Sequence, residues 1–302
     1  MPAAVRIYEN GGPEVLRLEE VDPGKPAAGE IQIRHTAIGV NYIDVYDRTG
    51  LYPVKLPSGL GREAAGVVTA LGRGVRGLRV GERVAYVFPS PGAYCELRNV
   101  PAERAVRVPR GISDEQAAAL MLKGLTAQFL IRRTHRVTHG DMILVHAAAG
   151  GVGSIAVQLA RRAGATVIGL ASPANHDWLA GHGVIPVAYG DGVAGRIRQA
   201  AGKVDAFIDT FGADYVELAL ELGVEPSRID TIANFEAPAK FGVKAEGNTA
   251  GAGASTLAEL AGLIADGQLE LPIAATFPLG QVQDAYRRLA SGHIRGKIVL
   301  IP

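Results

Sequence analysis

The sequence predicts an α/β protein of two domains, in which a β-rich domain is interrupted by a doubly wound parallel sheet. Its 302 residues are enough for two domains. The first hundred residues consist of short strand-like runs between turns that are rich in glycine and proline. From Asp141 to about Phe235, strands and helices alternate instead, which is typical of an open parallel sheet with helices on both faces.

The β-rich part begins with strand-like segments, of which Glu30–Ala37 alternates apolar and polar residues as a half-buried strand does. Ser113 and Gln116 then form the signature of a capping box, which predicts a helix that continues to about Leu122. A second helix is expected from about Gly124 into Arg133. The segments expected as strands are Ala3–Ile7, Leu16–Val21, Glu30–Ala37, Gly61–Gly72 and Arg83–Val87.

Short apolar runs are expected as the strands of the parallel sheet. They are Ile143–His146, Val167–Leu170, Pro186–Ala188, Ala206–Thr210 and Ile229–Ala233, with Phe241–Glu246 as a candidate edge strand. After Gly247–Ala254, a flexible connection of small residues, the chain is expected to form helices Thr256–Asp266 and Gln281–Leu289 and the strand Ile298–Ile301. We therefore expect residues 123–254 to form the nucleotide-binding domain, and residues 1–122 and 255–302 to form the β-rich one.

A glycine-rich turn follows the first strand of the alternating region. In that position one glycine permits a tight turn, one lets the backbone approach a pyrophosphate, and one lets the helix pack on the strand. The N-terminus of the following helix would face the anion. The spacing departs from a strict G-x-G-x-x-G, so a glycine turn in another kind of α/β domain stays open on this signal alone. The candidate contacts are Gly150, Gly151, Val152, Gly153 and Ser154.

The end of the next strand indicates which dinucleotide is preferred. A carboxylate that reads the ribose of NADH is expected ~20 residues after the turn, but none stands at this strand end. Ser172, Asn175 and His176 stand there instead, and such small or donor-bearing groups accept a 2′-phosphate that a carboxylate would repel. The sequence therefore favours NADPH.

Composition narrows the class of protein. The formal net charge of +1 gives no electrostatic reason to expect nucleic acid or a membrane surface as a partner. The N-terminal residues lack the layout of a signal peptide, and no apolar run reaches transmembrane length. The single cysteine, Cys95, excludes an intramolecular disulfide and a thiolate cluster for structural zinc. A cytoplasmic protein is expected.

Several motifs together resemble the medium-chain dehydrogenase/reductase superfamily, in particular its zinc-free, zeta-crystallin-like quinone oxidoreductase branch. The resemblance covers essentially the whole chain and is strongest in the first half. It implies a GroES-like catalytic domain, a Rossmann domain for NADPH, and hydride transfer to a quinone. After Ala171 the Ser172–Trp178 run looks more like another NADPH-dependent subgroup. The motifs are Gly11–Leu16, Gly39–Tyr46, Gly50–Pro53, Gly61–Val68, Lys123–Thr126 and His146–Gly153.

The resemblance indicates which positions would hold a catalytic zinc ion. The related zinc alcohol dehydrogenases place a cysteine where Asn41 stands and a histidine where Arg62 stands. Arginine cannot bind zinc, because its guanidinium stays protonated and offers only donors. We therefore expect no zinc, and we interpret His146 as a packed residue at a strand end.

The resemblance also implies site residues, which we group by role. As catalytic residues around a flat acceptor, it implies Asn41, Tyr46 and Tyr52 in a loop, although each tyrosine could instead be a loop aromatic stacked on the core. Arg295 and Lys297 lie in a tail segment that approaches the cofactor in relatives, with a solvated turn as the alternative. The implied cofactor contacts are Tyr42, Ile43, Asp44, Thr126, Gly150–Ser154, Ser172, Asn175, His176, Tyr189, Arg295 and Lys297.

The partners implied are a small quinone or enone and a second copy of the chain. Relatives pair edge strands of the nucleotide domain, and Phe241–Glu246 is the candidate for that strand, although the chain is short between Thr231 and Ser255. A 2-alkenal or enoyl-thioester reductase remains an alternative on the same scaffold. A cofactor-binding protein with little catalysis is a third reading, in which the lack of a basic stripe argues against RNA.

Overall fold

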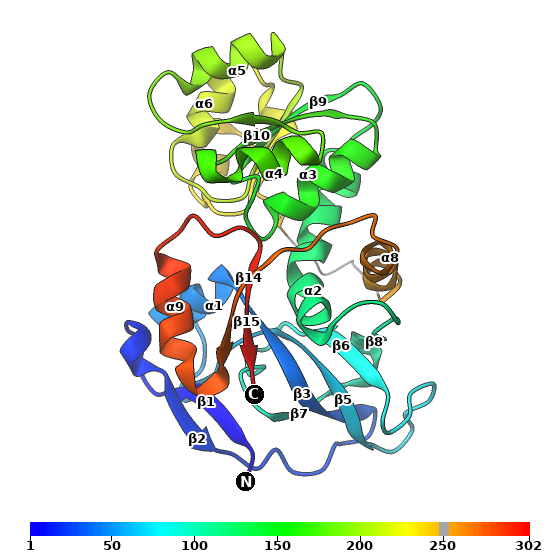
Figure 1. Ribbon diagram of the computed structural model, residues 1–302. Coiled ribbons are helices and arrows are strands. Elements are labelled where there is room, and N and C mark those ends of the chain that lie inside the picture. Colours follow the sequence, from blue (N-terminus) through cyan, green and yellow to red (C-terminus); the bar gives the residue numbers. More distant parts are fainter. Residues whose placement is uncertain (248–253) are drawn as a thin grey trace. The chain divides into compact units, whose positions relative to one another are not determined.

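The computed structural model describes residues 1–247 and 254–302, and the chain divides into two compact units. The β-rich unit consists of residues 1–122, 254–292 and 297–302, and the parallel-sheet unit of residues 123–247 and 293–296 (Figure 1). Residues 293–296, which the sequence assigned to the β-rich domain, thus group with the parallel sheet. The connection expected over Gly247–Ala254 lies outside the described residues except at its two ends.

The β-rich unit is built on a long strand, β3 (Glu30–Val40). One edge of β3 pairs with β5 (Glu63–Leu71), and its other edge pairs with β7 (Leu97–Pro101) and then with β15 (Lys297–Ile301). The main sheet runs in the order β14-β15-β3-β5-β6-β8, with β6 at Arg83–Val87, β8 at Ala105–Arg107 and β14 at Ile273–Pro278. A smaller sheet holds β1 (Ala3–Ile7), β2 (Arg17–Glu20) and β4 (Ser58–Gly59).

Most strands expected in the β-rich unit are confirmed, and the short ones were missed. The alternation of β3 holds as far as Ala37, after which Ile38–Val40 is buried on both faces between β5 and β15. Strands β4, β7, β8 and β14 were not predicted, because they are short or carry proline and charge at positions that only pairing with a neighbour defines.

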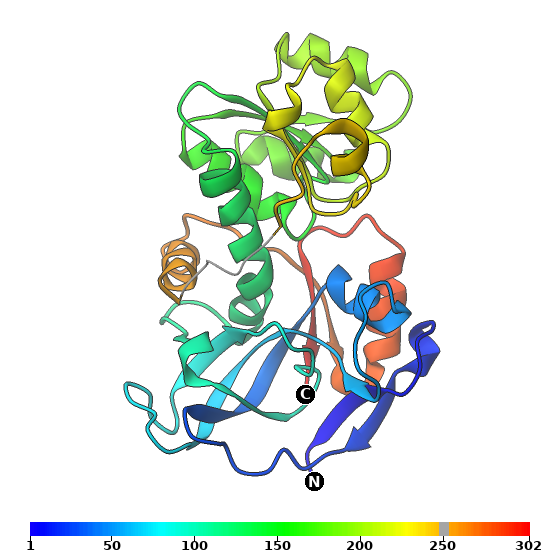
Figure 2. The ribbon, with the colours of Figure 1, turned by 180° about the vertical axis from the view of Figure 1, so that it is seen from behind.

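The helices of this unit include one that the sequence analysis described as a loop. Helix α1 (Tyr42–Thr49) follows β3 directly, and Gly50 ends it in the left-handed conformation with φ of 82°. Helix α9 (Val282–Ala290) lies beside α1 in both views (Figures 1 and 2). Helix α8 (Ala254–Ala265) ends before Gly267, as expected.

Helix α2 (Asp114–Phe129) begins at the predicted capping box, in which Ser113 and Gln116 exchange bonds of 3.0 and 3.2 Å. The expected break between Leu122 and Gly124 is wrong, because the helix continues without interruption. Burial of its apolar side chains in this stretch outweighs the low helix propensity of one glycine. The helix then widens into a π-helical turn, Leu130–Thr134.

The parallel-sheet unit has the predicted architecture, with strand order β11-β10-β9-β12-β13 and all pairs parallel. Helices α3 and α4 lie on one side of the sheet, and α5 and α6 on the other (Figure 1). The strands are β9 (Met142–His146), β10 (Thr166–Leu170), β11 (Ile185–Val187), β12 (Ala206–Asp209) and β13 (Ile229–Thr231). The helices are α3 (Gly153–Arg162), α4 (His176–Gly181), α5 (Val193–Ala201), α6 (Tyr215–Glu221) and α7 (Ala237–Phe241).

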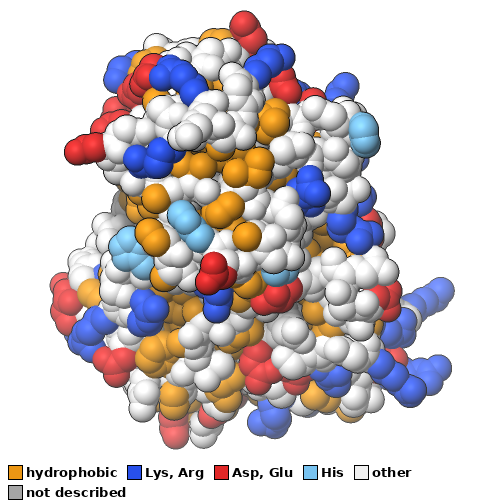
Figure 3. All heavy atoms as spheres, turned by 45° about the horizontal axis from the view of Figure 1, so that its top comes forward, with side chains coloured by type: hydrophobic (Ala, Val, Ile, Leu, Met, Phe, Trp, Pro, Cys, Tyr) orange, Lys and Arg blue, Asp and Glu red, His pale blue; other side chains and the backbone are white. Residues whose placement is uncertain are grey.

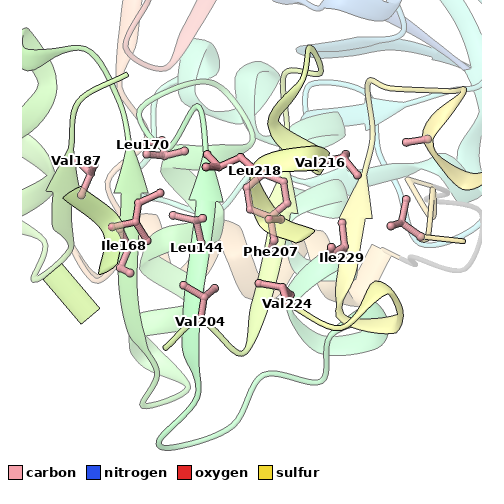
Figure 4. Packing of buried hydrophobic residues seen from close by; sticks show 14 residues of the cluster. Leu144, Ile168, Leu170, Val187, Val204, Phe207, Val216, Leu218, Val224 and Ile229 are labelled. Carbon is pink, nitrogen blue, oxygen red and sulfur yellow. The ribbon is translucent and has the colours of Figure 1, made fainter. Parts of the chain in front are cut away.

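The core of this unit lies between the sheet and its helices. Leu144, Ile168 and Phe207 are fully buried on three adjacent strands (Figure 4). Val216 and Ile229 close the same cluster from α6 and β13. This packing explains why the strands read as short apolar runs rather than as alternating ones, since both faces of a parallel sheet are covered.

The edge strand expected over Phe241–Glu246 is wrong. Phe241 ends α7, and only Lys244 bridges the edge strand β13, with its N–H donating to Ile229 at 3.0 Å and its carbonyl accepting from Thr231 at 3.1 Å. Gly242, in the left-handed conformation, turns the chain out of the helix and leaves too few residues for a strand.

His135, just after the π-helical turn, makes the stability of the parallel-sheet unit dependent on pH. Its side chain is 1% exposed, and neither ring nitrogen has a hydrogen-bond partner in the described part of the chain. Burial, together with the charges of Arg228 and Lys244, lowers its pKa to about 3. The unfolded chain therefore binds more protons than the folded one between pH ~6.5 and the folded pKa, and stability falls as pH falls through this window.

We expect His135→Gln to reduce this slope by up to about 1.4 kcal/mol per pH unit between pH 6 and pH 4. Urea unfolding followed by the fluorescence of Trp178, the single tryptophan, measures the parallel-sheet unit specifically. Equal slopes for wild type and variant would contradict the prediction.

Candidate functional site

The glycine turn between β9 and α3 places backbone groups where an anion can approach. Ala147 adopts the left-handed conformation with φ of 53°, and its carbonyl accepts the N–H of Gly150 at 2.8 Å. A Cβ on Gly153 would overlap that carbonyl oxygen and come 2.8 Å from the Cα of Ala148. Only glycine therefore lets α3 begin this close to the strand end, and the N-terminus of a helix is a favourable position for an anion.

The members of this turn differ in exposure. Gly150 and Gly151 are half-buried, whereas Val152 and Gly153 are buried. Ser154 is fully buried, and its hydroxyl has no hydrogen-bond partner in the described part of the chain. Contact with a ligand at this turn is thus expected mainly through the backbone.

The residues predicted to select NADPH meet at the end of β10. Asn175 donates to the Ser172 hydroxyl at 3.1 Å. Nε2 of His176 lies 3.2 Å from the carbonyl of Ala171, so this nitrogen carries the donated proton. The Tyr189 hydroxyl donates to the carbonyl of Leu170 at 3.0 Å. Side chains from two segments, residues 172–176 and Tyr189, therefore surround one strand end, and no carboxylate belongs to these contacts.

Asp209, which the sequence analysis did not single out, joins the carboxyl ends of three strands. One carboxylate oxygen accepts from Nδ1 of His146 at 2.8 Å and from the N–H groups of Phe211 and Gly212 at 3.0 and 2.8 Å. The other accepts from the hydroxyl of Thr231 at 2.6 Å. Because ligands bind beyond the carboxyl ends of parallel strands where the strand order reverses, this network fixes the loops on which a dinucleotide would lie.

The network is buried, and its charge is stabilised by hydrogen bonds. His146 and Asp209 are 1% and 0% exposed. Burial alone would raise the pKa of Asp209, but the bonds from His146, Thr231 and Gly212 hold it below its usual value. Tyr215 stacks on the His146 ring with centroids 3.9 Å apart. His146 is therefore a packed residue at a strand end, as expected, and it also orients the carboxylate.

In the β-rich unit, Asn41 begins helix α1. It forms a capping box with Asp44, whose carboxylate accepts the N–H of Asn41 at 2.9 Å. Asn41 is 1% exposed, and its side-chain nitrogen donates to Glu63 at 2.8 Å. The amide is thus held between protein groups, which indicates a positioning role.

Lys297 and Glu63 complete this buried cluster. The Lys297 ammonium donates to the carbonyl of Val40, to Oδ1 of Asn41 and to Oε1 of Glu63, at 2.7, 2.7 and 2.8 Å. Its side chain is 2% exposed and that of Glu63 is fully buried. The solvated turn considered for Lys297 is therefore wrong, because its three N–H groups are satisfied inside the β-rich unit. Exposed Arg295, two residues earlier, is consistent with such a turn.

Arg62 stands at the second position of the zinc pattern and is also paired. One guanidinium nitrogen, Nη2, contacts both carboxylate oxygens of Asp47 at 2.7 Å, and the other, Nη1, donates to the carbonyl of Pro89. Asp47 is fully buried. Because this charge-assisted contact is buried at Asp47 and a second nitrogen is held by Pro89, Arg62 acts here as a fixed structural cation next to α1.

Tyrosines of α1 and the following turn form a row. The ring centroids of Tyr42 and Tyr46 are 6.5 Å apart, and those of Tyr46 and Tyr52 are 5.4 Å apart at an edge-to-face angle of 67°. Burial and the nearby charge of Asp47 raise the pKa of Tyr52, so its hydroxyl stays protonated and able to donate. Tyr42 is 38% exposed.

Asp44 was predicted as a cofactor contact, but its side chain is fully buried. Burial raises its pKa to about 7, although hydrogen bonds from Tyr94 and from the N–H of Asn41 oppose that shift. Tyr94 donates to it at 2.8 Å and contacts the Tyr286 hydroxyl at 3.3 Å. Its side chain therefore holds α1 in place, and of the three predicted contacts Tyr42, Ile43 and Asp44 only the first two are accessible to solvent.

Comparison with known proteins agrees with this geometry. A family model described as "Alcohol dehydrogenase GroES-like domain" matches residues 27–110, and one described as "Zinc-binding dehydrogenase" matches residues 184–300. A quinone oxidoreductase of Pseudomonas aeruginosa is 37% identical over the whole of both chains. The chain belongs to the quinone oxidoreductase family.

Two further members of the superfamily bear on the site. The structure of Escherichia coli quinone oxidoreductase, described as complexed with NADPH, matches with a TM-score of 0.90 and 35% identity over 99% of this chain and 100% of that one. A 2-haloacrylate reductase of a Burkholderia species is 35% identical over 100% of this chain and 99% of its own. The GroES-like and Rossmann domains expected from the sequence are confirmed.

Proposed function

We propose that this member of the quinone oxidoreductase family transfers a hydride from NADPH to a quinone. The observation that carries the proposal is the glycine turn, where the Ala147 carbonyl and the start of α3 leave room only for glycine at 153. A turn of this shape accepts a dinucleotide pyrophosphate on backbone N–H groups. NADPH, when bound, supplies the hydride.

The choice of NADPH rests on the end of β10. Ser172, Asn175 and His176 would hold the 2′-phosphate, with Tyr189 packed beside them. Arg295, which is exposed, and Thr126 of α2 are further proposed cofactor contacts. The E. coli relative, whose structure is described with NADPH, supports this choice.

The proposed chemistry uses no zinc. Asn41 offers an amide already held by Lys297 and Glu63, and Arg62 is a protonated guanidinium held by Asp47. These groups do not fit a zinc site, which takes thiolate, imidazole or carboxylate ligands. The described residues also contain no group of three or more histidine, cysteine or acidic side chains arranged to hold a metal ion.

The chain's own residues would orient the acceptor and stabilise its developing oxyanion. A flat quinone ring suits the row of Tyr42, Tyr46 and Tyr52, because aromatic faces stack. Tyr46 and the protonated hydroxyl of Tyr52 are the proposed hydrogen-bond donors, and Asn41 positions the helix that carries Tyr46.

The proposed partners are a small quinone or enone and a second copy of the chain. On the face drawn in Figure 3, basic and acidic side chains are interspersed, which gives no stripe of one sign for a nucleic acid. None of the described helices is long and apolar enough to cross a membrane. Cytoplasmic location and homodimer formation are part of the proposal.

Reduction of an enal or enoyl group is the second candidate, because the 2-haloacrylate reductase acts, by its name, on an unsaturated acid. The same tyrosine row and cofactor turn would serve it. Cofactor binding with little catalysis is the third.

One experiment tests cofactor and substrate in turn. Calorimetric titration is expected to show tighter binding of NADPH than of NADH, and Ser172→Asp is expected to weaken NADPH by about tenfold or more through repulsion of the 2′-phosphate. Turnover of a panel of quinones and 2-alkenals with NADPH is then expected to be fastest with quinones.

Each other outcome selects a different reading. Equal affinity for both cofactors in the wild type would overturn the NADPH assignment. Turnover confined to enals would reject the quinone, and NADPH binding without any turnover would favour the non-catalytic reading.

A further inference from the structure

We infer that Gly296 and Lys297 couple the cofactor turn to helix α1, so that NADPH bound at the turn steadies the residues that face the acceptor. The inference rests on the proposed function, because it takes the turn as the NADPH site. It assigns Lys297 as a positioning residue rather than a cofactor contact.

The first half of the link lies in the parallel-sheet unit. The N–H of Gly296 donates to the carbonyl of Ala149, inside the glycine turn, at 2.9 Å. Gly296 is buried, and its φ of 81° is in the left-handed region, where a side chain would be strained. The position of residue 296 is therefore fixed by the same turn that would receive the pyrophosphate.

The second half lies in the β-rich unit and begins at the next residue. The Lys297 ammonium donates hydrogen bonds to the carbonyl of Val40 and to the side chain of Asn41. Val40 is the last residue of β3, and Asn41 is the N-cap of α1. Glu63 balances its charge. One peptide bond thus separates a hydrogen bond to the cofactor turn from the groups that fix the start of α1.

Helix α1 is sensitive to such a link because it is short. Eight residues make two turns, which is too few for a stable helix in water without its cap and its packing. The cap is Asn41, and the orientation of its amide is set by Lys297 on one side and Glu63 on the other. A ligand that orders residues 149 and 296 therefore favours the capped helix, and by reciprocity the capped helix favours the ligand.

Hydrogen–deuterium exchange of the backbone amides of residues 42–49 tests the link directly. In the wild type, saturating NADPH is expected to slow this exchange at least about fivefold, the lower end of ordinary coupling between sites. In Lys297→Met the slowing is expected to disappear, and Lys297→Arg, which keeps the charge, is expected to recover part of it. Lys25→Met, an exposed lysine of the same unit, serves as the matched control and keeps the wild-type response.

The exchange rates with and without NADPH distinguish a lysine that couples the two sites from one that only stabilises helix α1. A lysine that only stabilised α1 would, when replaced, speed exchange by the same factor with and without NADPH, and that result overturns the inference. Because Lys297→Met leaves Glu63 buried without a counter-charge, the double variant Lys297→Met/Glu63→Gln is measured as well, and it too is expected to lose the response.

Calorimetry on the same samples distinguishes failure of the coupling from failure of the proposed cofactor. NADPH that binds the wild type but leaves exchange over residues 42–49 unchanged overturns the coupling and leaves the proposed cofactor standing. A wild type that does not bind NADPH overturns both.

Discussion

Replacing Asp209 by alanine is expected to lower the free energy of unfolding of the parallel-sheet unit by about 3–5 kcal/mol. The substitution leaves four donors without their acceptor in a buried place. They are Nδ1 of His146, the N–H groups of Phe211 and Gly212, and the hydroxyl of Thr231. Urea unfolding monitored by the fluorescence of Trp178 measures the loss.

The matched control is Asp191→Ala, which removes an exposed carboxylate of the same unit. It is expected to change stability by no more than about 0.5 kcal/mol. A loss below about 1 kcal/mol for Asp209→Ala would contradict the view that this carboxylate ties β9, β12 and β13 together.

Replacing Gly153 by alanine is expected to weaken NADPH binding by at least about a hundredfold, or about 2.7 kcal/mol. The new methyl group would overlap the carbonyl of Ala147 and press on the backbone of Ala148, neither of which can move without opening the turn. The turn and the start of α3 would then no longer keep the backbone positions proposed for the pyrophosphate site. Calorimetric titration with NADPH measures the effect.

Gly195→Ala provides the matched control for this substitution. Gly195 lies inside α5 with nothing within 4 Å of its added Cβ, so alanine is expected to keep NADPH affinity and to stabilise the helix by about 0.5–1 kcal/mol. Wild-type NADPH affinity in Gly153→Ala would exclude this turn as the pyrophosphate site.

The elements that the sequence predicts well are those whose signal is local. The strands and helices of the parallel-sheet unit follow from apolar runs and glycine stops, and the β10 end was located by counting from the glycine turn. Strand β14 and helix α1 were missed because pairing with β15 and the capping of Asn41 by Asp44 define them. The α2 break was predicted from Gly124, whose low propensity the buried surroundings override.

In the candidate site, too, the residues with a local sequence signal were predicted and those defined by distant contacts were not. Ser172, Asn175, His176 and Tyr189 meet at one strand end, as their motif positions suggested. The buried charges were not foreseen, since Asp209 ends an apolar strand and Glu63 follows Arg62, which instead pairs with Asp47. Asp209 binds a residue 63 positions away, and Glu63 binds one 234 positions away. Their role in a buried network could have been inferred only from the rule that a buried charge needs a partner.

The place of β15 between β3 and β14 determines the order in which the two units can form on the ribosome. Every strand of the parallel sheet lies within residues 142–231, so that sheet is complete while later residues are still being synthesised. The main sheet of the β-rich unit waits for residues 297–301. Until they emerge, the edge of β3 at Ile38–Val40 is unpaired, and such an edge is a site for aggregation and for chaperone binding.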